Sequence, residues 1–322
     1  MNTRKLGDSD LNAPPLCLGS NVFGWTIDEK TSFAILDALV AAGFNFIDTA
    51  DMYSTWVPGH KGGESETIIG NWMKRMGNRS KVIIATKVGK EMGPNDKGLS
   101  KAYIFRAVER SLERLQTDYI DLYQSHADDA NTPIEETLEA YAELIKQGKV
   151  RAIGASNYTA ELLAAALDAS ERHGYPRYES LQPHYNLYER AGYEAALEPL
   201  CLVKGLSVIP YFSLASGFLT GKYRSESDLS KSPRGQGVKK YLNERGLRIL
   251  AALDQVAREH HSTPGKVALA WLLARPGITA PIASATSVEQ LHDLIGATNL
   301  TLDRQSIEIL NQASAWSAAT AV

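Results

Sequence analysis

The chain has 322 residues, 44% of them hydrophobic and 22% charged, a balance typical of a globular protein and not of a disordered one. Its 34 basic and 37 acidic residues leave a formal net charge of −3, which gives no electrostatic case for nucleic acid or an anionic membrane as a partner. No apolar run approaches the roughly 20 residues of a membrane helix. The only cysteines, Cys17 and Cys201, form neither a disulfide framework nor a zinc signature. We therefore expect a cytoplasmic protein without a metal, and the sequence leaves its oligomeric state open.

Short apolar runs alternate with amphipathic segments along almost the whole chain. Eight of the runs are predicted to be strands, at residues 16–18, 44–48, 82–86, 120–123, 150–153, 179–182, 206–210 and 279–282. Runs this short and this apolar are typical of parallel strands that are covered on both faces. The pattern therefore predicts repeated βα units and a parallel sheet, either open or closed.

The intervening segments carry helix start and stop signals. Thr132 and Pro133, followed by Glu135, predict a capped helix with a capping box. Thr263 and Pro264 predict a second helix start of the same kind. Glycine adopts a left-handed conformation without steric cost, and four helices are expected to end at Gly43, Gly148, Gly174 and Gly205.

Two architectures are compatible with this alternation, a closed barrel and an open, doubly wound sheet. Eight βα units favour the barrel, although periodicity alone does not exclude the open sheet. No G-x-G-x-x-G motif follows an early strand, which weakens the dinucleotide-binding version of the open sheet. We predict an α/β fold, a (β/α)8 TIM barrel, as a single domain over residues 1–322, with a short N-terminal hairpin and extra C-terminal helices. Such barrels collect their chemistry at the C-terminal ends of the strands.

Four ionisable side chains follow three consecutive predicted strands at these ends: Asp48 and Tyr53, then Lys87, then His126. Each has an ordinary explanation when taken alone. The carboxylate could cap a helix, the lysine could be solvated, the tyrosine could pack in the core and the histidine could be a satisfied buried ring. Their arrival together at neighbouring strand ends predicts a catalytic site.

These residue types suit hydride transfer to a carbonyl group, because the alkoxide that forms needs a proton. A free phenol has a pKa of about 10 and is a poor acid at neutral pH. A nearby ammonium group that is held by a carboxylate is expected to lower this pKa, and a decrease of roughly three units corresponds to about 4 kcal/mol. We therefore predict that Tyr53 is the general acid, that Lys87 and Asp48 tune its pKa, and that His126 orients the carbonyl oxygen.

At these residues the chain resembles the aldo-keto reductase superfamily, in particular its bacterial members and the branch that includes the potassium-channel β-subunits. The motifs D-T-A-x-x-Y, A-T-K, D-L-Y-Q-x-H, G-x-S-N, Q-x-x-Y-N and L-x-x-G-x-L-T-G-K-Y match in order over nearly the full length. The resemblance implies the barrel, the tetrad described above, and a nicotinamide cofactor that binds without a Rossmann domain. It also implies carboxamide contacts from Ser156, Asn157 and Gln182, and a ring from Tyr211 that stacks on the nicotinamide.

Two further segments are expected to contact the dinucleotide. Residues 225–237 form a polar segment that closes over the pyrophosphate in similar proteins, which makes Lys222 and Arg234 candidates for phosphate contact. Residues 284–291 begin a helix, and helix N-termini favour phosphate. The remaining predicted cofactor contacts are Ser213, Leu214, Gly217, Ser284, Thr286 and Gln290. We predict NADP(H) as the cofactor. Many relatives carry a basic residue near position 286 and an asparagine at position 294, where this chain has leucine, and for this reason NAD(H) stays an alternative.

Two tryptophans, Trp25 and Trp56, lie in loops that line the substrate mouth in the resembled family. They predict an apolar, aromatic pocket for a small-molecule carbonyl or alcohol. The leading hypothesis is a reductase of aldehydes and ketones that also runs in reverse. One alternative is a cofactor-binding regulatory subunit of a membrane partner with the same barrel, and another is a barrel lyase or isomerase that uses no nicotinamide.

Overall fold

The computed structural model describes residues 2–316, and its centre is a sheet of eight parallel strands. The strands are β3 (Cys17–Gly19), β4 (Phe46–Asp48), β5 (Ile83–Val88), β6 (Ile120–Ser125), β7 (Val150–Ser156), β8 (Tyr178–Gln182), β9 (Ser207–Val208) and β10 (Ile282–Ala283). Their order in the sheet is β10-β3-β4-β5-β6-β7-β8-β9, so neighbours in the chain are neighbours in space. Successive βα units produce a sheet in which the strands follow one another in chain order, as they do here.

Backbone hydrogen bonds between β9 and the segment before β10 close the sheet on itself. The amide of Val208 donates to the carbonyl of Gly277 at 3.1 Å, and the amide of Thr279 donates to the carbonyl of Val208 at 2.8 Å. One step further along, the amide of Ile282 donates to the carbonyl of Pro210 at 2.9 Å. The predicted (β/α)8 barrel is therefore confirmed, and the open sheet is excluded.

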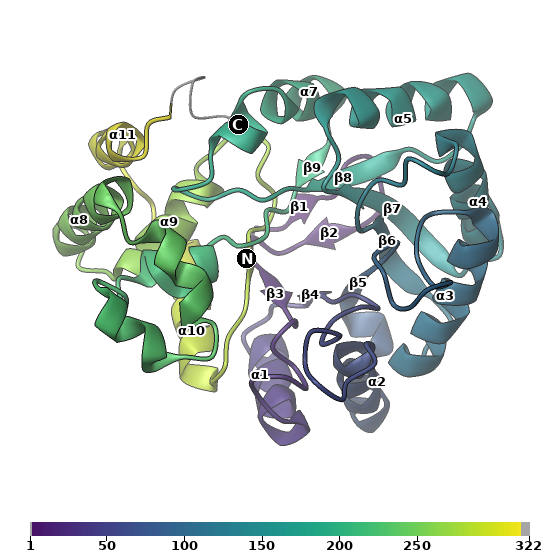
Figure 1. The fold of residues 1–322 in the computed structure, drawn as a ribbon, viewed down its shortest axis with the longest axis horizontal. Coiled ribbons are helices and arrows are strands. Elements are labelled where there is room, and N and C mark those ends of the chain that lie inside the picture. The colour runs from purple at the N-terminus through teal and green to yellow at the C-terminus, as the bar shows by residue number, and fades with distance from the viewer. Residues whose placement is uncertain (1, 317–322) are drawn as a thin grey trace.

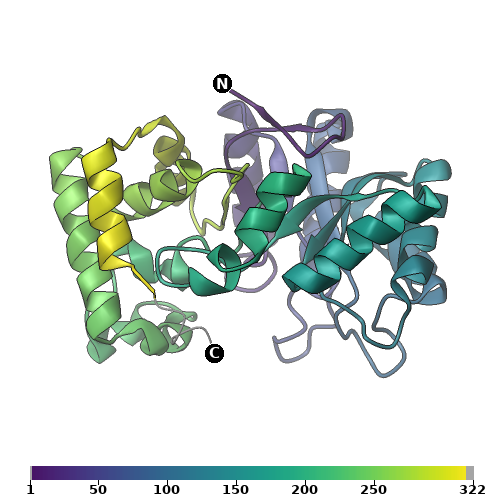
Figure 2. The same ribbon diagram turned by 90° about the horizontal axis from the view of Figure 1, so that it is seen from above.

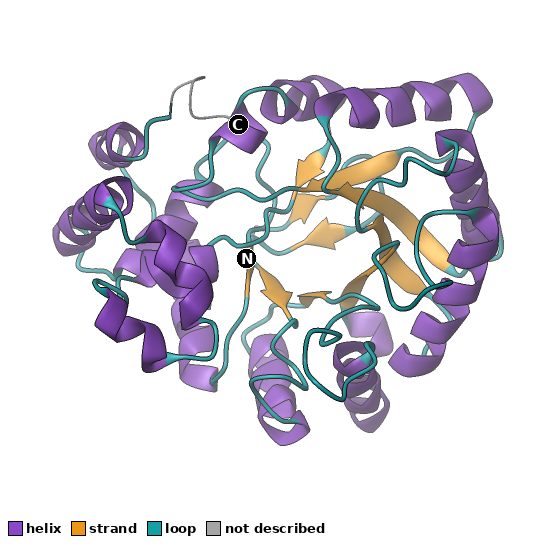
Figure 3. Ribbon diagram, viewed as in Figure 1, coloured by secondary structure: helices purple, strands orange, loops and turns teal. Residues whose placement is uncertain are grey.

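Helices surround the strands, as Figures 1 and 3 show. They are α1 (Glu29–Ala41), α2 (Glu64–Met76), α3 (Lys101–Leu115), α4 (Ile134–Lys146), α5 (Ala160–His173), α6 (Ala191–Glu194), α7 (Leu197–Lys204), α8 (Glu244–Glu259), α9 (Pro264–Leu273), α10 (Val288–Gly296) and α11 (Arg304–Ala313). Short 3-10 turns include η1 (Arg79–Lys81), η2 (Ala215–Thr220), η3 (Glu226–Lys231), η4 (Gly235–Tyr241) and η5 (Ala297–Asn299). No helix within residues 2–316 is long and apolar enough to cross a membrane.

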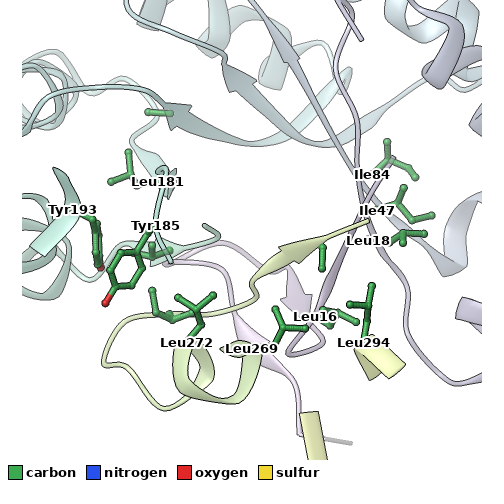
Figure 4. Packing of buried hydrophobic residues seen from close by; sticks show 14 of the residues in the cluster. Leu16, Leu18, Ile47, Ile84, Leu181, Tyr185, Tyr193, Leu269, Leu272 and Leu294 are labelled. Atoms are coloured by element: carbon green, nitrogen blue, oxygen red, sulfur yellow. The ribbon is translucent and has the colours of Figure 1, made fainter. Parts of the chain in front are cut away.

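The apolar core has two parts, one between the strands and the helices and one inside the barrel. Ile47, Ile84 and Leu181 face the outer layer, where Figure 4 shows the packing of buried side chains. Phe46 and Ile83 belong to the inner part, which also contains residues of the N-terminal hairpin. Burying apolar surface in both layers supplies the main stabilisation of the fold.

The predicted N-terminal hairpin is confirmed as β1 (Arg4–Lys5) paired with β2 (Asn12–Ala13) in antiparallel fashion. Leu6 and Leu11 from its turn pack into the barrel interior. The Ser207 hydroxyl, at the start of β9, donates to the carbonyl of Lys5 at 3.0 Å. The hairpin therefore covers the N-terminal end of the barrel, opposite the end where the strands finish, and Figure 2 shows it along the upper edge of the molecule.

Several predicted boundaries differ from the structure. The third, fourth and fifth barrel strands run two or three residues further than predicted, so Lys87 lies inside β5 and not after it. The eighth strand is Ile282–Ala283 and not 279–282, because residues 277–279 pair with Val208 instead and Pro281 has no amide hydrogen to donate. The prediction of one domain over residues 1–322 extends beyond the described residues and stays a prediction.

The predicted cap at Thr132 is wrong, whereas the predicted cap at Thr263 is confirmed. The side chain of Thr132 donates to Asp129 at 2.7 Å, and Pro133 occupies the N-cap position of α4 without a side-chain cap. The Asp129 carboxylate also accepts a hydrogen bond from the amide of Leu99, so it draws Thr132 away from the helix. In α9, the side chain of Thr263 accepts from the amide of Lys266, as expected of an N-cap.

Candidate active site

Three of the four predicted catalytic side chains form one hydrogen-bonded unit. The ammonium group of Lys87 donates to Oδ2 of Asp48 at 2.7 Å and to the phenol oxygen of Tyr53 at 2.8 Å. The phenol in turn donates to Oδ2 of Asp48 at 3.2 Å. Lys87 is fully buried and Asp48 is 1% exposed, so water does not screen this ion pair. The structure thus brings together residues that are far apart in the sequence.

Two buried amides complete the surroundings of the Asp48 carboxylate. Nε2 of Gln182 donates to Oδ1 of Asp48 at 2.9 Å, and Nε2 of Gln124 donates to the same oxygen at 3.3 Å. The ammonium group of Lys87 has a further acceptor in the carbonyl of Thr49 at 2.7 Å. The buried charges are therefore both paired and hydrogen-bonded, which is the condition under which buried ion pairs are tolerated. The contact of these two glutamines with Asp48 was not predictable from the sequence.

The pKa of Tyr53 departs from its usual value in the direction opposite to the expected one. Burial raises the pKa most, and the negative charge of Asp48 raises it further. The expectation that Lys87 and Asp48 together lower the pKa of Tyr53 is therefore wrong for this structure, because desolvation outweighs the ammonium group. As a result the phenol carries its proton throughout the neutral pH range.

His126 lies beside this unit, at the end of β6. Its ring centre is 6.2 Å from that of Tyr53, with the rings edge to face, and the side chain is 6% exposed. Burial lowers the pKa of His126 well below its usual value, and the charges of Lys87 and Lys90 lower it further. The imidazole is therefore neutral at neutral pH. Its Nδ1 is buried and has no hydrogen-bond partner among the described residues, whereas the side chain as a whole lines the cavity described below.

A cavity of about 970 Å³ opens above these residues at the C-terminal ends of the strands. Asp48, Tyr53 and His126 line it, whereas Lys87 lies behind Tyr53 and does not. Every residue predicted to contact the cofactor lines the same cavity: Ser156, Asn157, Gln182, Tyr211, Ser213, Leu214, Gly217, Lys222, Arg234, Ser284, Thr286 and Gln290. The structure therefore gathers the two predicted sets of site residues around one space.

The predicted carboxamide partners already form hydrogen bonds to one another and to the tetrad region. Nδ2 of Asn157 donates to the carbonyl of His126 at 2.8 Å, and its Oδ1 accepts from the hydroxyl of Tyr211 at 2.7 Å. The hydroxyl of Ser156 donates to the carbonyl of Gln182 at 2.9 Å. Asn157 has a φ of 57°, in the left-handed region that asparagine tolerates better than most residues. Both Nδ2 hydrogens of Asn157 are used, the second by the hydroxyl of Ser156 at 3.0 Å, so Oδ1 with its second lone pair is the atom left to accept a hydrogen bond from a cofactor amide.

The segment after β9 is built from left-handed residues. Phe212, Ala215, Ser216 and Gly217 all have positive φ angles, the last of 93°. The φ angle of Gly217 favours glycine, and a Cβ atom there would also lie 3.0 Å from Cε of Lys222, a tight contact with that side chain. Lys222, which follows this segment, lines the cavity.

The N-terminus of α10 is capped by its own side chains. Ser287 accepts from the amide of Gln290 at 3.2 Å, and Oε1 of Gln290 accepts from both the amide and the hydroxyl of Thr286 at 3.0 Å each. No basic residue stands at this point, as the sequence indicated. Instead Lys266, at the start of α9, lines the cavity and pairs with Asp293 of α10 at 3.0 Å. The sequence analysis missed Lys266, although its place in the first turn after Thr263 was a usable signal.

The two predicted substrate residues differ in their positions. Trp56 lines the cavity and is 43% exposed. Trp25 packs edge to face against Trp56, with ring centres 5.4 Å apart, and is not among the cavity-lining residues. Phe212, which the sequence analysis missed, also lines the cavity and is 42% exposed. The mouth therefore has aromatic rings on two separate segments, and Trp25 supports one of them from outside.

Comparison with known proteins places this site in a family. A model of the aldo/keto reductase family matches residues 15–315 of the chain. The chain belongs to the aldo/keto reductase family. Within residues 2–316 of this aldo/keto reductase, no group of histidine, cysteine or acidic side chains is arranged to hold a metal ion.

Individual relatives cover nearly the whole chain. A Bacillus subtilis (strain 168) protein named "Uncharacterized oxidoreductase YrpG" is 38% identical over 314 residues, 95% of this chain and 94% of the relative. "Protein tas" of Escherichia coli (strain K12) is 33% identical over 340 residues, 97% of this chain and 98% of the relative. A "Probable voltage-gated potassium channel subunit beta" of Arabidopsis thaliana is 33% identical over 308 residues, 93% of this chain and 92% of the relative. The family and the relative named as an oxidoreductase support an oxidoreductase function for this chain.

Proposed function

We propose that this aldo/keto reductase is an NADP(H)-dependent enzyme that reduces aldehydes and ketones to alcohols, and that the reaction is reversible. The observation that carries the proposal is the phenol of Tyr53, held by Lys87 and Asp48 at the wall of a large cavity. A protonated phenol with a buried ammonium group behind it is suited to protonate a carbonyl oxygen on which charge develops.

The residues of the cavity fit a phosphate-bearing nicotinamide cofactor. Neither Lys222 nor Arg234 forms an ion pair with a carboxylate of the described chain, and both line the cavity. Asn157 and Gln182 offer side-chain amides, which carry both a donor and an acceptor as a carboxamide requires. The ring of Tyr211, stacked on His184 at 18°, is the proposed support for the nicotinamide. When bound, the nicotinamide supplies or accepts the hydride, and the chain supplies the proton.

Tyr53 is the proposed proton donor. Because burial raises the pKa of the phenol, Tyr53 holds its proton until the carbonyl oxygen becomes more basic. The ammonium group of Lys87, at 2.8 Å, then stabilises the phenolate that is left, and Asp48 keeps the ammonium in place. General acid catalysis of this kind contributes roughly 100- to 10,000-fold to the rate.

His126 is the proposed orienting group for the carbonyl oxygen. The lowered pKa of the imidazole keeps it neutral, so it approaches the oxygen as a hydrogen-bond donor and does not compete with Tyr53 for the proton transfer. Its place in the cavity wall, beside the ring of Tyr53, supports this role.

The preference for NADP(H) over NAD(H) rests on the cations at the far end of the cavity. Arg234 and Lys266 lie there without a basic residue at position 286, and burial lowers the pKa of Arg234. A desolvated guanidinium gains more from a phosphate than an exposed one. NAD(H) stays the alternative, because Asp293 is placed to repel the extra phosphate as well as to pair with Lys266.

The experiment that tests the proposal measures initial rates with NADPH and with NADH against a panel of aromatic and aliphatic aldehydes and ketones. We expect NADPH to bind, as seen by quenching of tryptophan fluorescence, and to be oxidised when a carbonyl compound is added. Binding of NADPH without any oxidation by the panel would contradict the reductase. Absence of NADPH binding would instead favour a barrel lyase or isomerase.

A second candidate function is a cofactor-binding regulatory subunit of a membrane partner. The observation in its favour is the Arabidopsis relative named as a potassium channel β-subunit, 33% identical over 308 residues. The hydrogen-bonded unit of Asp48, Tyr53 and Lys87 favours the enzyme, since a purely regulatory subunit needs no proton donor. Turnover with added aldehyde separates the two functions.

The cytoplasmic location of this protein stays a prediction.

A further inference from the structure

Lys90 is a cation in the cavity wall that the proposed hydride transfer does not use. It follows β5, three residues beyond Lys87, and lines the same cavity as Tyr53, His126 and Trp56. Lys87 already has its acceptors in Asp48, Thr49 and Tyr53. Lys90 has no such role in the tetrad, and its side chain is half-buried.

The charges around the cavity are unbalanced toward positive. Its cationic lining residues are Lys90, Lys222, Lys231, Arg234 and Lys266, and its only carboxylates among the described residues are Asp48 and Asp293. Both carboxylates are paired, with Lys87 and Lys266 respectively, and Lys231 pairs with Asp228 at 2.7 Å. Lys90, Lys222 and Arg234 are therefore left without an ion pair among the described residues, and the cavity attracts anionic ligands.

Lys90 is separated along the chain from the other unpaired cations of the cavity. Lys222 and Arg234 stand on the segment between η2 and η4, which the proposed function assigns to the cofactor phosphates. Lys90 instead comes two residues after the end of β5, the strand that carries Lys87, and this places it at the reacting end of the cavity. Its charge also contributes to lowering the pKa of His126. A phosphate held by the first two residues leaves Lys90 without a partner.

The environment of Lys90 makes an unpaired ammonium group costly. The adjacent carboxylate, Glu91, pairs with Lys97 at 3.5 Å and is 64% exposed. Burial and the charge of Lys87 lower the pKa of Lys90, and no carboxylate of the described chain offsets them. A half-buried charge in the cavity wall loses hydration without gaining an ion pair, and an anionic ligand would compensate for that loss.

We propose that Lys90 binds a carboxylate group of the substrate, so that the preferred substrates are aldehydes or ketones that also carry an acid group. This inference rests on the proposed function, since it concerns the substrate of the same site. One compact ammonium group, with no arginine and no second unpaired lysine beside it at this end, suits a singly charged carboxylate better than a phosphate ester. Trp56 and Phe212, exposed at the mouth, would cover an apolar linker between the acid and the carbonyl carbon.

The first test compares two matched aldehydes, 4-carboxybenzaldehyde and its neutral methyl ester, with NADPH as the cofactor. We expect the native enzyme to have a higher kcat/KM for the acid. Lys90→Met should lower kcat/KM for the acid by about 10- to 100-fold, the usual range for one charge-assisted hydrogen bond, and should change the ester less than twofold. Lys90→Arg, which keeps the charge, should retain most of the preference.

The matched control is Lys97→Met, because Lys97 lies on the same loop, is 57% exposed and is not among the cavity-lining residues. It should leave the rates with both aldehydes unchanged. Equal use of the acid and the ester by the native enzyme, or an equal loss for both in Lys90→Met, would overturn the inference. Thermal melts of each variant establish that the protein is folded.

A second measurement does not depend on turnover. Titration of 4-carboxybenzaldehyde into the protein without nucleotide should quench tryptophan fluorescence, since Trp56 lines the cavity. The affinity should fall about tenfold or more in Lys90→Met and not in Lys97→Met. Binding that depends on Lys90 in a protein that reduces neither aldehyde would support the carboxylate site and overturn the proposed function. Binding that is equal in the native protein and in Lys90→Met would overturn the carboxylate site.

Discussion

The two ends of the cavity are built in different ways. At the reacting end, Asp48 and Lys87 lie within β4 and β5, are almost fully buried, and find all their partners inside the protein. At the far end, Lys222 and Arg234 lie on the segment between η2 and η4, and neither forms an ion pair with the described chain. The reacting end is thus preorganised by the barrel, whereas the far end is left for a ligand to complete.

The largest expected effect at the preorganised end is on the chemical step. Tyr53→Phe removes the proton donor and keeps the ring, so the rate of carbonyl reduction should fall by about 100- to 10,000-fold. The affinity for NADPH should change less than twofold, because the hydroxyl contacts Lys87 and Asp48 and not the far end. Single-turnover rates and fluorescence titration measure the two quantities. Unchanged turnover would remove Tyr53 from the role of acid.

Breaking the buried ion pair between Lys87 and Asp48 should lower stability much more than breaking an ion pair at the surface. Lys87→Met leaves the Asp48 carboxylate buried without a cation, and this should lower the free energy of unfolding by about 3–5 kcal/mol. The matched control is Lys149→Met, which removes an exposed ion pair with Glu109 and should cost less than about 1 kcal/mol. Chemical denaturation of the three proteins gives the comparison. Similar losses of unfolding free energy in both variants would mean that burial of the Lys87–Asp48 pair adds no cost when one partner is removed.

At the far end, a single cation should affect binding and leave folding unchanged. Arg234→Ala should weaken NADPH by about 10- to 100-fold, the range for one charge-assisted contact, and NADH by less. Dissociation constants for both nucleotides, with melts of the protein without ligand, test this directly. Equal weakening of both nucleotides would assign Arg234 to the pyrophosphate that they share. No weakening of either would exclude it from the cofactor site.

The last expected effect is on the pH dependence of stability and concerns a buried carboxyl group near the end of β4. Asp51 is 2% exposed with no hydrogen-bond partner for either oxygen among the described residues. Burial raises the pKa of Asp51 well above its usual value, and the charge of Glu66 raises it further. In the unfolded chain the group ionises near pH 4. The folded protein should therefore lose stability as the pH rises from about 4 toward the raised pKa, by up to about 1.4 kcal/mol per pH unit.

Asp51→Asn should remove this dependence. The variant should gain stability over the native protein at pH 8 and should gain less at pH 5. The lowered pKa of His126 makes both proteins less stable below about pH 6.5, where the unfolded histidine takes up a proton, and it cancels in the difference. Denaturation midpoints at the two pH values supply the measurement. A gain that does not vary with pH would contradict a protonated Asp51.

The tetrad was predictable because the barrel imposes a rule on its strands. Parallel strands finish at one rim, so polar residues near the ends of consecutive strands must meet. Asp48, Tyr53 and Lys87 obey this rule and meet within hydrogen-bonding distance. The cofactor residues implied by the family resemblance likewise line one cavity, although nothing in their local pattern would have placed Ser156 beside Gln182.

The order of residues alone thus specified the βα repeats, the hairpin, some helix ends and the rim on which the chemistry lies. These features depend on local hydrogen bonding and on the alternation of apolar and polar side chains, which are properties of short segments. Tertiary structure alone decided that burial raises the pKa of Tyr53, that Gln124 and Gln182 bind Asp48, and that Lys90 faces the cavity without an acid partner. Desolvation and pairing depend on which distant segments surround a group, and no stretch of sequence records its own surroundings.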